Sequence, residues 1–111
     1  MKGLKGFEVF QLALALVRNA DLIEKSRRHD PKLADELRRA TTSIALNTAE
    51  GSGRSGRSGP HHYDIAYGSK REVEAAILIA QAWGYVAEEE AAKALEIADR
   101  LGAMLWRARG S

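Results

Sequence analysis

Apolar residues recur at intervals of three and four along most of this chain, the spacing that places side chains on one face of an α-helix. In residues 7–27 they form two neighbouring stripes, one of Phe7, Phe10, Leu14 and Val17 and another of Ala13, Leu16, Ala20 and Ile23. Two stripes give a wider apolar face than one partner helix requires. This segment is therefore predicted to be a helix in the middle of a bundle or, alternatively, a helix with a partner-binding face.

The same spacing predicts three more helices, over residues 31–50, 60–83 and 87–109. Asp30 is a good N-cap and Pro31 fits the first helical position, so the second helix is expected to start there. Glycines are expected to end the second and third helices, at Gly51 and Gly84. Only the connection over residues 51–59 is long.

Four helices joined mainly by short connections predict an all-α fold, an antiparallel up-down-up-down four-helix bundle in a single domain over residues 1–111. Apolar residues make up 45% of the chain and aromatic residues only 6%. Much of the apolar content is alanine, which buries little area and favours close approach between helices. A bundle this short has few ways to bury every apolar face, so we expect it to form a homo-oligomer.

The second helix also carries polar residues at helical spacing, namely Arg39, Ser43, Asn47 and Glu50. Short polar side chains let two backbones approach while they hydrogen-bond to each other. The stripe is therefore either a tight packing surface or a simply exposed face. The third helix has a similar pair, Gly68 and Ser69, and a glycine inside a helix indicates close contact with another helix, because it costs about 1 kcal/mol relative to alanine.

From these residues we predict a structural polar network of Ser43, Asn47, Glu50 and Ser69, with Arg39 or Arg71 as the cationic partner. For Glu50 the ordinary alternative is an ion pair, and a general base is a further one.

The charge of the chain is unevenly distributed. The net charge is only +2, yet residues 38–71 hold six basic residues and two acidic ones, Glu50 and Asp64. This local excess is the footprint expected of a contact with a polyanion, although exposed arginines also serve solubility. The predicted nucleic-acid-binding residues are Arg54, Arg57, Arg38, Arg39, Lys70 and Arg71.

Several kinds of site are not supported by the sequence. The Gly-Ser-Arg loop lacks the Walker spacing and follows no strand, which excludes a P-loop. His61 and His62 are adjacent, so on a helix they point about 100° apart and cannot chelate one ion together, and no Glu-x-x-His motif is present. No nucleophile, base and acid arrangement is visible. We expect no enzyme activity, no metal and no cofactor.

Cysteine is absent, which excludes disulfides and suits a reducing compartment. The apolar run near the start ends at Arg18 and is too short to span a bilayer. The sequence therefore predicts a cytoplasmic protein without a membrane partner.

Four segments resemble a known family: FEVFQLA at residues 7–13, LRRA at residues 37–40, SIALNTAEGSGR at residues 43–54, and AYGSKREVE at residues 66–74. They are similar to the four-helix bundle family of the proteins encoded in intervening sequences of 23S ribosomal RNA and of the accessory proteins of diversity-generating retroelements. The resemblance covers nearly the whole chain in order.

This resemblance implies up-down bundles assembled as ring-shaped homopentamers, without catalytic activity. For the retroelement branch it implies binding to a reverse transcriptase and to nucleic acid. Two departures stand out: Ala45 replaces a proline that many relatives carry, and residues 59–62 replace a more apolar start of the third helix. Because of the second departure, the partner binding that the resemblance implies is less expected at the start of the third helix of this chain.

Taken together, the sequence favours a non-enzymatic oligomeric adaptor that binds RNA or DNA weakly and without sequence specificity. The alternative is a homo-oligomeric assembly protein with protein partners only.

Overall fold

The structure is a computed structural model that describes residues 3–53 and 58–110, and every regular element in those ranges is an α-helix. The helices are α1 (Gly3–Val17), α2 (Ala20–His29), α3 (Pro31–Gly53), α4 (Ser58–Ala82) and α5 (Glu88–Arg109). No strand occurs in the described ranges, which confirms the predicted all-α class.

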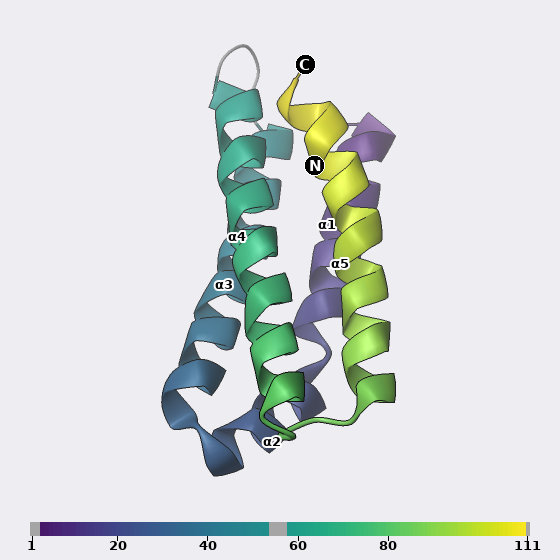
Figure 1. Cartoon of the computed structure of the whole chain (residues 1–111). Helices are drawn as coiled ribbons and strands as arrows, with labels where there is room; N and C mark the ends of the chain where they lie inside the picture. Colours follow the sequence, from purple (N-terminus) through teal and green to yellow (C-terminus); the bar gives the residue numbers. More distant parts are fainter. Residues whose placement is uncertain (1–2, 54–57, 111) are drawn as a thin grey trace.

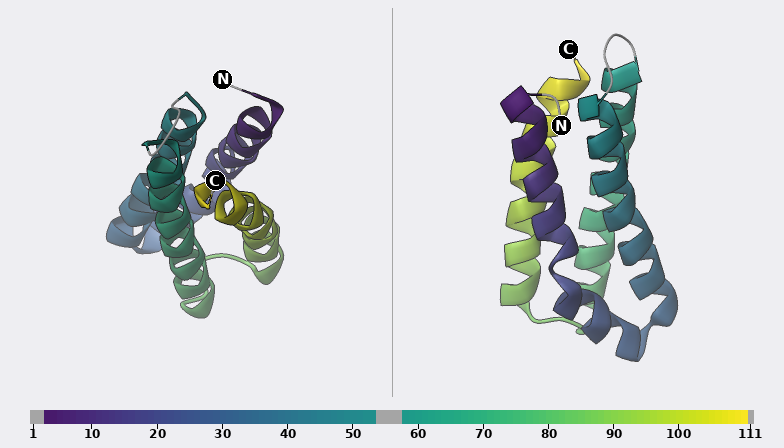
Figure 2. Two further views of the ribbon diagram at one scale, coloured as in Figure 1. Left: turned by 90° about the horizontal axis from the view of Figure 1, so that it is seen from above. Right: turned by 180° about the vertical axis from the view of Figure 1, so that it is seen from behind.

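The helices form an elongated bundle of 43 × 22 × 19 Å. α3 and α4 pack along each other, α5 packs on α4, and α1 fills the space against α3 and α5 (Figures 1 and 2). α2 is short and crosses one end of the bundle, beside the start of α3. The end of α3, the start of α4 and the end of α5 lie together at the opposite end.

The core is built largely from alanine and a few branched residues. One of the two predicted α1 stripes is buried, through Ala13 and Leu16, and belongs to the same core cluster as the buried Leu37, Ile44 and Leu101 of α3 and α5. Fully buried alanines at Ala34, Ala40, Ala66, Ala80, Ala91 and Ala94 separate these larger side chains. Small residues at these positions let the helices approach closely, as the composition predicts.

The first predicted helix is wrong in one respect, because it is interrupted between α1 and α2. Asn19 adopts φ −79° and ψ 47°, outside the helical region. Its side-chain Nδ2 donates to the Ala15 carbonyl at 2.9 Å, and its backbone N–H turns to the Leu16 carbonyl at 3.1 Å. The asparagine thus satisfies the end of α1 and lets the chain change direction into α2.

The start of α3 forms as the sequence indicates. Asp30 Oδ1 accepts a hydrogen bond from the Leu33 N–H at 3.0 Å, and Pro31 is the first helical residue. At its other end α3 continues past the expected stop at Gly51 to Gly53. Gly84 has a φ of +79°, a conformation that suits glycine, and it turns the chain between α4 and α5.

Several large apolar side chains remain on the surface of the chain. On α1 the stripe of Phe7 and Val17 is only partly covered, and Leu46 of α3 and Trp83, directly after α4, are 64% and 69% exposed. Despite this apolar surface, none of the described helices is long and hydrophobic enough to cross a bilayer.

Candidate nucleic-acid interface

Short polar side chains join α3 to α4. Ser43 Oγ and Ser69 Oγ lie 2.8 Å apart, and Asn47 Nδ2 donates to the Ser43 carbonyl at 3.0 Å. Asn47 Oδ1 accepts from His62 Nδ1 at 3.0 Å, because an amide oxygen can only accept. The structure therefore brings Ser43, Asn47 and Ser69 together and adds His62, which the sequence analysis did not place in this network.

The three charged candidates for the predicted network, Glu50, Arg39 and Arg71, are all exposed in the chain. Arg39 pairs with Glu36 of its own helix at 2.6 Å and with Glu72 of α4. These contacts lower the pKa of Glu36 and raise that of Arg39, chiefly through their mutual hydrogen bond. Arg39 is thus an exposed residue whose ion pairs connect α3 to α4, and Glu36 and Glu72 compensate its positive charge.

Gly68 does not make the close contact that the sequence predicts within this chain. A Cβ placed on Gly68 meets no atom within 4 Å, and the residue is exposed. The neighbouring Ser69 provides the tight approach instead, because it is the residue that faces Ser43.

Of the six predicted nucleic-acid-binding residues, Arg38 and Arg71 are exposed and make no ion pair with another residue of the described ranges. Arg38 borders a hollow of about 340 Å³ beside the break between α1 and α2, together with Thr41 and Thr42. Arg54 and Arg57 lie outside the described residues.

Lys70 does not belong to the exposed basic surface. It is only 7% exposed, and its Nζ donates to Glu74 Oε1 at 2.7 Å and lies 4.7 Å from the centre of the Tyr67 ring. The side chain can lie across α5 because residue 102 is glycine. A Cβ at Gly102 would come within 2.9 Å of the Lys70 Cε and Nζ atoms.

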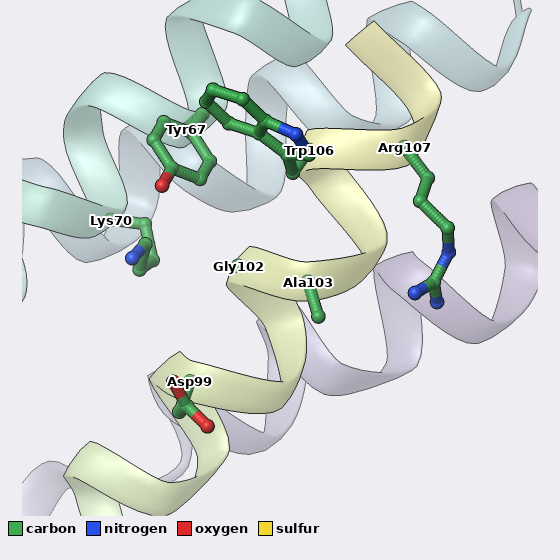
Figure 3. Close-up of a pocket in the computed structure, with 7 residues that line it drawn as sticks. All are labelled: Tyr67, Lys70, Asp99, Gly102, Ala103, Trp106 and Arg107. Atoms are coloured by element: carbon green, nitrogen blue, oxygen red, sulfur yellow. The ribbon is translucent and has the colours of Figure 1, made fainter. Parts of the chain in front are cut away.

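Lys70 instead forms one wall of a pocket between α4 and α5, with a volume of about 370 Å³. Figure 3 shows the small residues Gly102 and Ala103 in the middle of the pocket, with Tyr67 and Trp106 toward one end and Asp99 toward the other. Arg107 borders the side away from Lys70. The pocket therefore combines aromatic rings, two cations and one carboxylate.

The aromatic end of this pocket is an ordered cluster. The Tyr67 and Trp106 rings are tilted by 58° with centres 5.3 Å apart, and Arg109 Cζ lies 3.6 Å from the centre of the Trp106 ring. Arg109 is also 3.6 Å from Asp64 through Nη1. Trp106 nevertheless remains 54% exposed. The local sequence gives no sign of this cluster, because its aromatic residues are about 40 positions apart and only the packing of α5 on α4 joins them.

A second aromatic group lies at the other end of the bundle. His29, Tyr85 and Trp83 form a ladder of nearly parallel rings, with centres 5.0 and 6.3 Å apart. In the described part of the chain, no three histidine or carboxylate side chains come together in a way that could hold a metal ion. The His61 and His62 rings meet edge to face.

Comparison with known proteins connects this arrangement with a sequence family and a solved structure. The family described as 23S rRNA-intervening sequence protein matches residues 5–107. A crystal structure of a protein with unknown function from the S23 ribosomal protein family, from Bacteroides thetaiotaomicron, is similar with a TM-score of 0.86 and 18% identity, covering 97% of this chain and 100% of that one. At this identity the likeness concerns the fold alone. No curated protein matches.

Proposed function

Because the chain belongs to the 23S rRNA-intervening sequence protein family, we propose that it is a non-enzymatic oligomeric adaptor that binds RNA or DNA weakly and without sequence specificity. The observation that carries this proposal is the basic excess of residues 38–71, in which Arg38 and Arg71 are exposed. Neither the family description nor that of the similar crystal structure names a catalytic activity. In this proposal the adaptor works in the cytoplasm.

The proposed topology is an antiparallel up-down-up-down bundle. Contacts between α3 and α4 support it: Asn47 pairs with His62, Ser43 with Ser69, and Arg39 with Glu72. Along this series the residue number falls on α3 and rises on α4, as it does between two antiparallel helices. In sequence, residues 54–57 connect the two helices of this hairpin. Arg54 and Arg57 are proposed as the first contacts with phosphate groups.

The proposed assembly is a homo-oligomer, with a ring-shaped pentamer taken from the family resemblance. Leu46 lies seven positions from Arg39 on α3, and Ile65 and Ile79 lie seven positions on either side of Glu72 on α4. A seven-residue spacing keeps side chains on one helix face, and Arg39 contacts Glu72. This spacing places the three exposed apolar side chains on the same side of the two helices, which supports a contact face there.

Assembly is tested by light scattering on the parent and on the double variant Leu46→Ser, Ile79→Ser. The parent is expected to have a multiple of the monomer mass at micromolar concentration, and the variant a smaller mass, because two apolar anchors are lost. Ala92→Ser, an exposed change on α5, serves as the control. A monomeric parent would contradict the assembly.

Nucleic-acid binding is tested by fluorescence anisotropy at low salt with a labelled single strand and a labelled duplex. The double variant Arg54→Ala, Arg57→Ala is expected to bind both probes more weakly, and by the same factor for probes of different sequence. The matched control removes two exposed arginines outside residues 38–71, Arg28→Ala and Arg100→Ala, with the same loss of charge. Absence of binding by the parent would leave the assembly with protein partners as the better account.

A further inference from the structure

The pocket between α4 and α5 has the volume and the mixed aromatic and charged lining of a small-molecule site. Its volume of about 370 Å³ lies near the lower end of the roughly 300–1,000 Å³ of small-molecule sites. This leaves room for a single planar group with its substituent, and not for an extended chain. The middle of the pocket is formed by Gly102 and Ala103, whose lack of bulk keeps the space open (Figure 3).

The aromatic end offers one ring face to a ligand. Arg109 covers one face of Trp106 with its guanidinium group, 3.6 Å from the ring centre. Tyr67 fixes the ring from the side at 5.3 Å. Trp106 is 54% exposed and lines the pocket, which leaves ring surface on which a ligand can stack.

The charged residues make the two ends of the pocket electrostatically different. Lys70 is held in place by Glu74 at 2.7 Å and by the face of Tyr67, and an ammonium group has three donors, so it can still donate to a polar ligand atom. Arg107 borders the pocket near the Trp106 end, whereas Asp99 lies at the far end. A phosphate group is therefore favoured beside Arg107 and disfavoured beside Asp99.

We propose that this pocket binds one unpaired nucleobase of a single strand, stacked on Trp106 with its phosphate toward Arg107. The inference rests on the proposed nucleic-acid binding and deepens it. Proteins that bind single strands without sequence preference combine a cationic groove with aromatic side chains on which bases stack. His29, Tyr85 and Trp83 line neither of the two hollows described above. Trp83 therefore serves as the control for ligand binding at Trp106.

The first experiment uses the two tryptophans of the chain separately. In Trp83→Phe, excitation at wavelengths that tyrosine does not absorb reports Trp106 alone. Adenosine 5′-monophosphate at millimolar concentration is expected to quench this signal, whereas ribose 5-phosphate is not. In Trp106→Phe the same nucleotide is expected to leave Trp83 unchanged. Equal quenching by both ligands, or none by the nucleotide, would overturn the proposal.

The second experiment blocks the pocket without touching the core. Ala103→Phe, placed in the Trp83→Phe background, changes an exposed residue in the middle of the pocket and is expected to abolish quenching. Ala92→Phe makes the same change at an exposed position of the same helix outside the pocket, and is expected to preserve it. Circular dichroism checks that both variants keep the helical fold. Persistent quenching in folded Ala103→Phe would contradict the site.

The third experiment separates this inference from the proposed function. Ala103→Phe is expected to weaken binding of a single-stranded nonanucleotide by about fivefold or more, the effect of losing one base–aromatic stack, and to leave duplex binding unchanged. RNA and DNA strands are compared in parallel.

If the parent binds strands and Ala103→Phe binds them equally well, the proposed function stands and the pocket inference fails. If the parent binds no strand but the mononucleotide still quenches Trp106 until Ala103→Phe blocks it, the nucleobase site stands and the proposed function fails.

Discussion

At the scale of single residues, Gly51 has a packing role that differs from its expected role as a helix stop. It is buried near the end of α3, and a Cβ built there would lie 3.0 Å from the Cε1 and Cζ atoms of Tyr63. Burial also raises the pKa of the Tyr63 hydroxyl. The glycine therefore allows the Tyr63 ring to pack directly on the α3 backbone.

Gly51→Ala is expected to lower the free energy of unfolding by about 1 kcal/mol, because overpacking of roughly 1–3 kcal/mol outweighs the gain in helix propensity. Gly53→Ala, two positions later, meets nothing within 4 Å and should have no such cost. Urea unfolding of both variants measures the difference. Equal stability of the two would show that Tyr63 moves away freely.

Lys70 illustrates which residue properties the sequence reveals. Its ion pair with Glu74 follows the four-residue spacing of a helix and could have been predicted. Its burial could not, because the space it occupies is created by Gly102, 32 positions further along the chain. For the same reason, the pocket that contains Trp106 has no signal in the local sequence.

Acid sensitivity is expected from the pair of Lys25 and Glu90. Lys25 Nζ donates to Glu90 Oε2 at 2.7 Å, and this hydrogen bond holds the pKa of Glu90 below its ordinary value. A carboxylate with a depressed pKa stabilises the fold above its unfolded pKa, and this contribution is lost as the pH falls through the folded value.

The parent should therefore lose more stability than the Lys25→Met variant between pH 7 and about pH 3, below the ordinary Glu pKa of about 4.3. Urea midpoints at the two pH values provide the measurement. Lys32→Met, which removes an exposed lysine from α3, should behave as the parent. A pH dependence unchanged by Lys25→Met would show that the pair adds nothing to stability.

At the scale of helices, the apolar periodicity predicts correctly that a segment is helical, but it does not predict where a helix is interrupted. The two stripes on residues 7–27 run through Asn19 without a gap, so they predict one helix. The interruption depends on the Asn19 side chain, which takes the Ala15 carbonyl. Periodicity shows which helix faces are apolar. It does not show that the Asn19 side chain takes a backbone carbonyl as its hydrogen-bond acceptor.

The cap of α3 is a helix feature that the sequence does reveal. Asp30→Ala is expected to lower the free energy of unfolding by about 1 kcal/mol, the ordinary cost of losing an N-cap. Asp30→Asn keeps the oxygen that accepts from the Leu33 N–H and removes the charge, so it should retain most of the stability. If Asp30→Asn costs as much as Asp30→Ala, the charge of Asp30 matters more than its hydrogen bond.

At the scale of the whole molecule, the sequence predicts the all-α class and the family, and the match over residues 5–107 confirms the family. Both depend on features spread along the entire chain, such as apolar spacing and motif order. The surface that remains apolar in the single chain, at Leu46, Ile79 and Trp83, is a property of packing and appears only in three dimensions.

The central claim of this account is that the basic segment of residues 38–71 binds the phosphates of nucleic acid. The salt dependence of affinity tests it most directly, because each phosphate neutralised on duplex DNA adds about 0.9 to the slope of log affinity against log salt concentration. We expect a steep negative slope for the parent and a shallower one for Arg54→Ala, Arg57→Ala. An affinity that is independent of salt, or the same slope in both proteins, would contradict the claim.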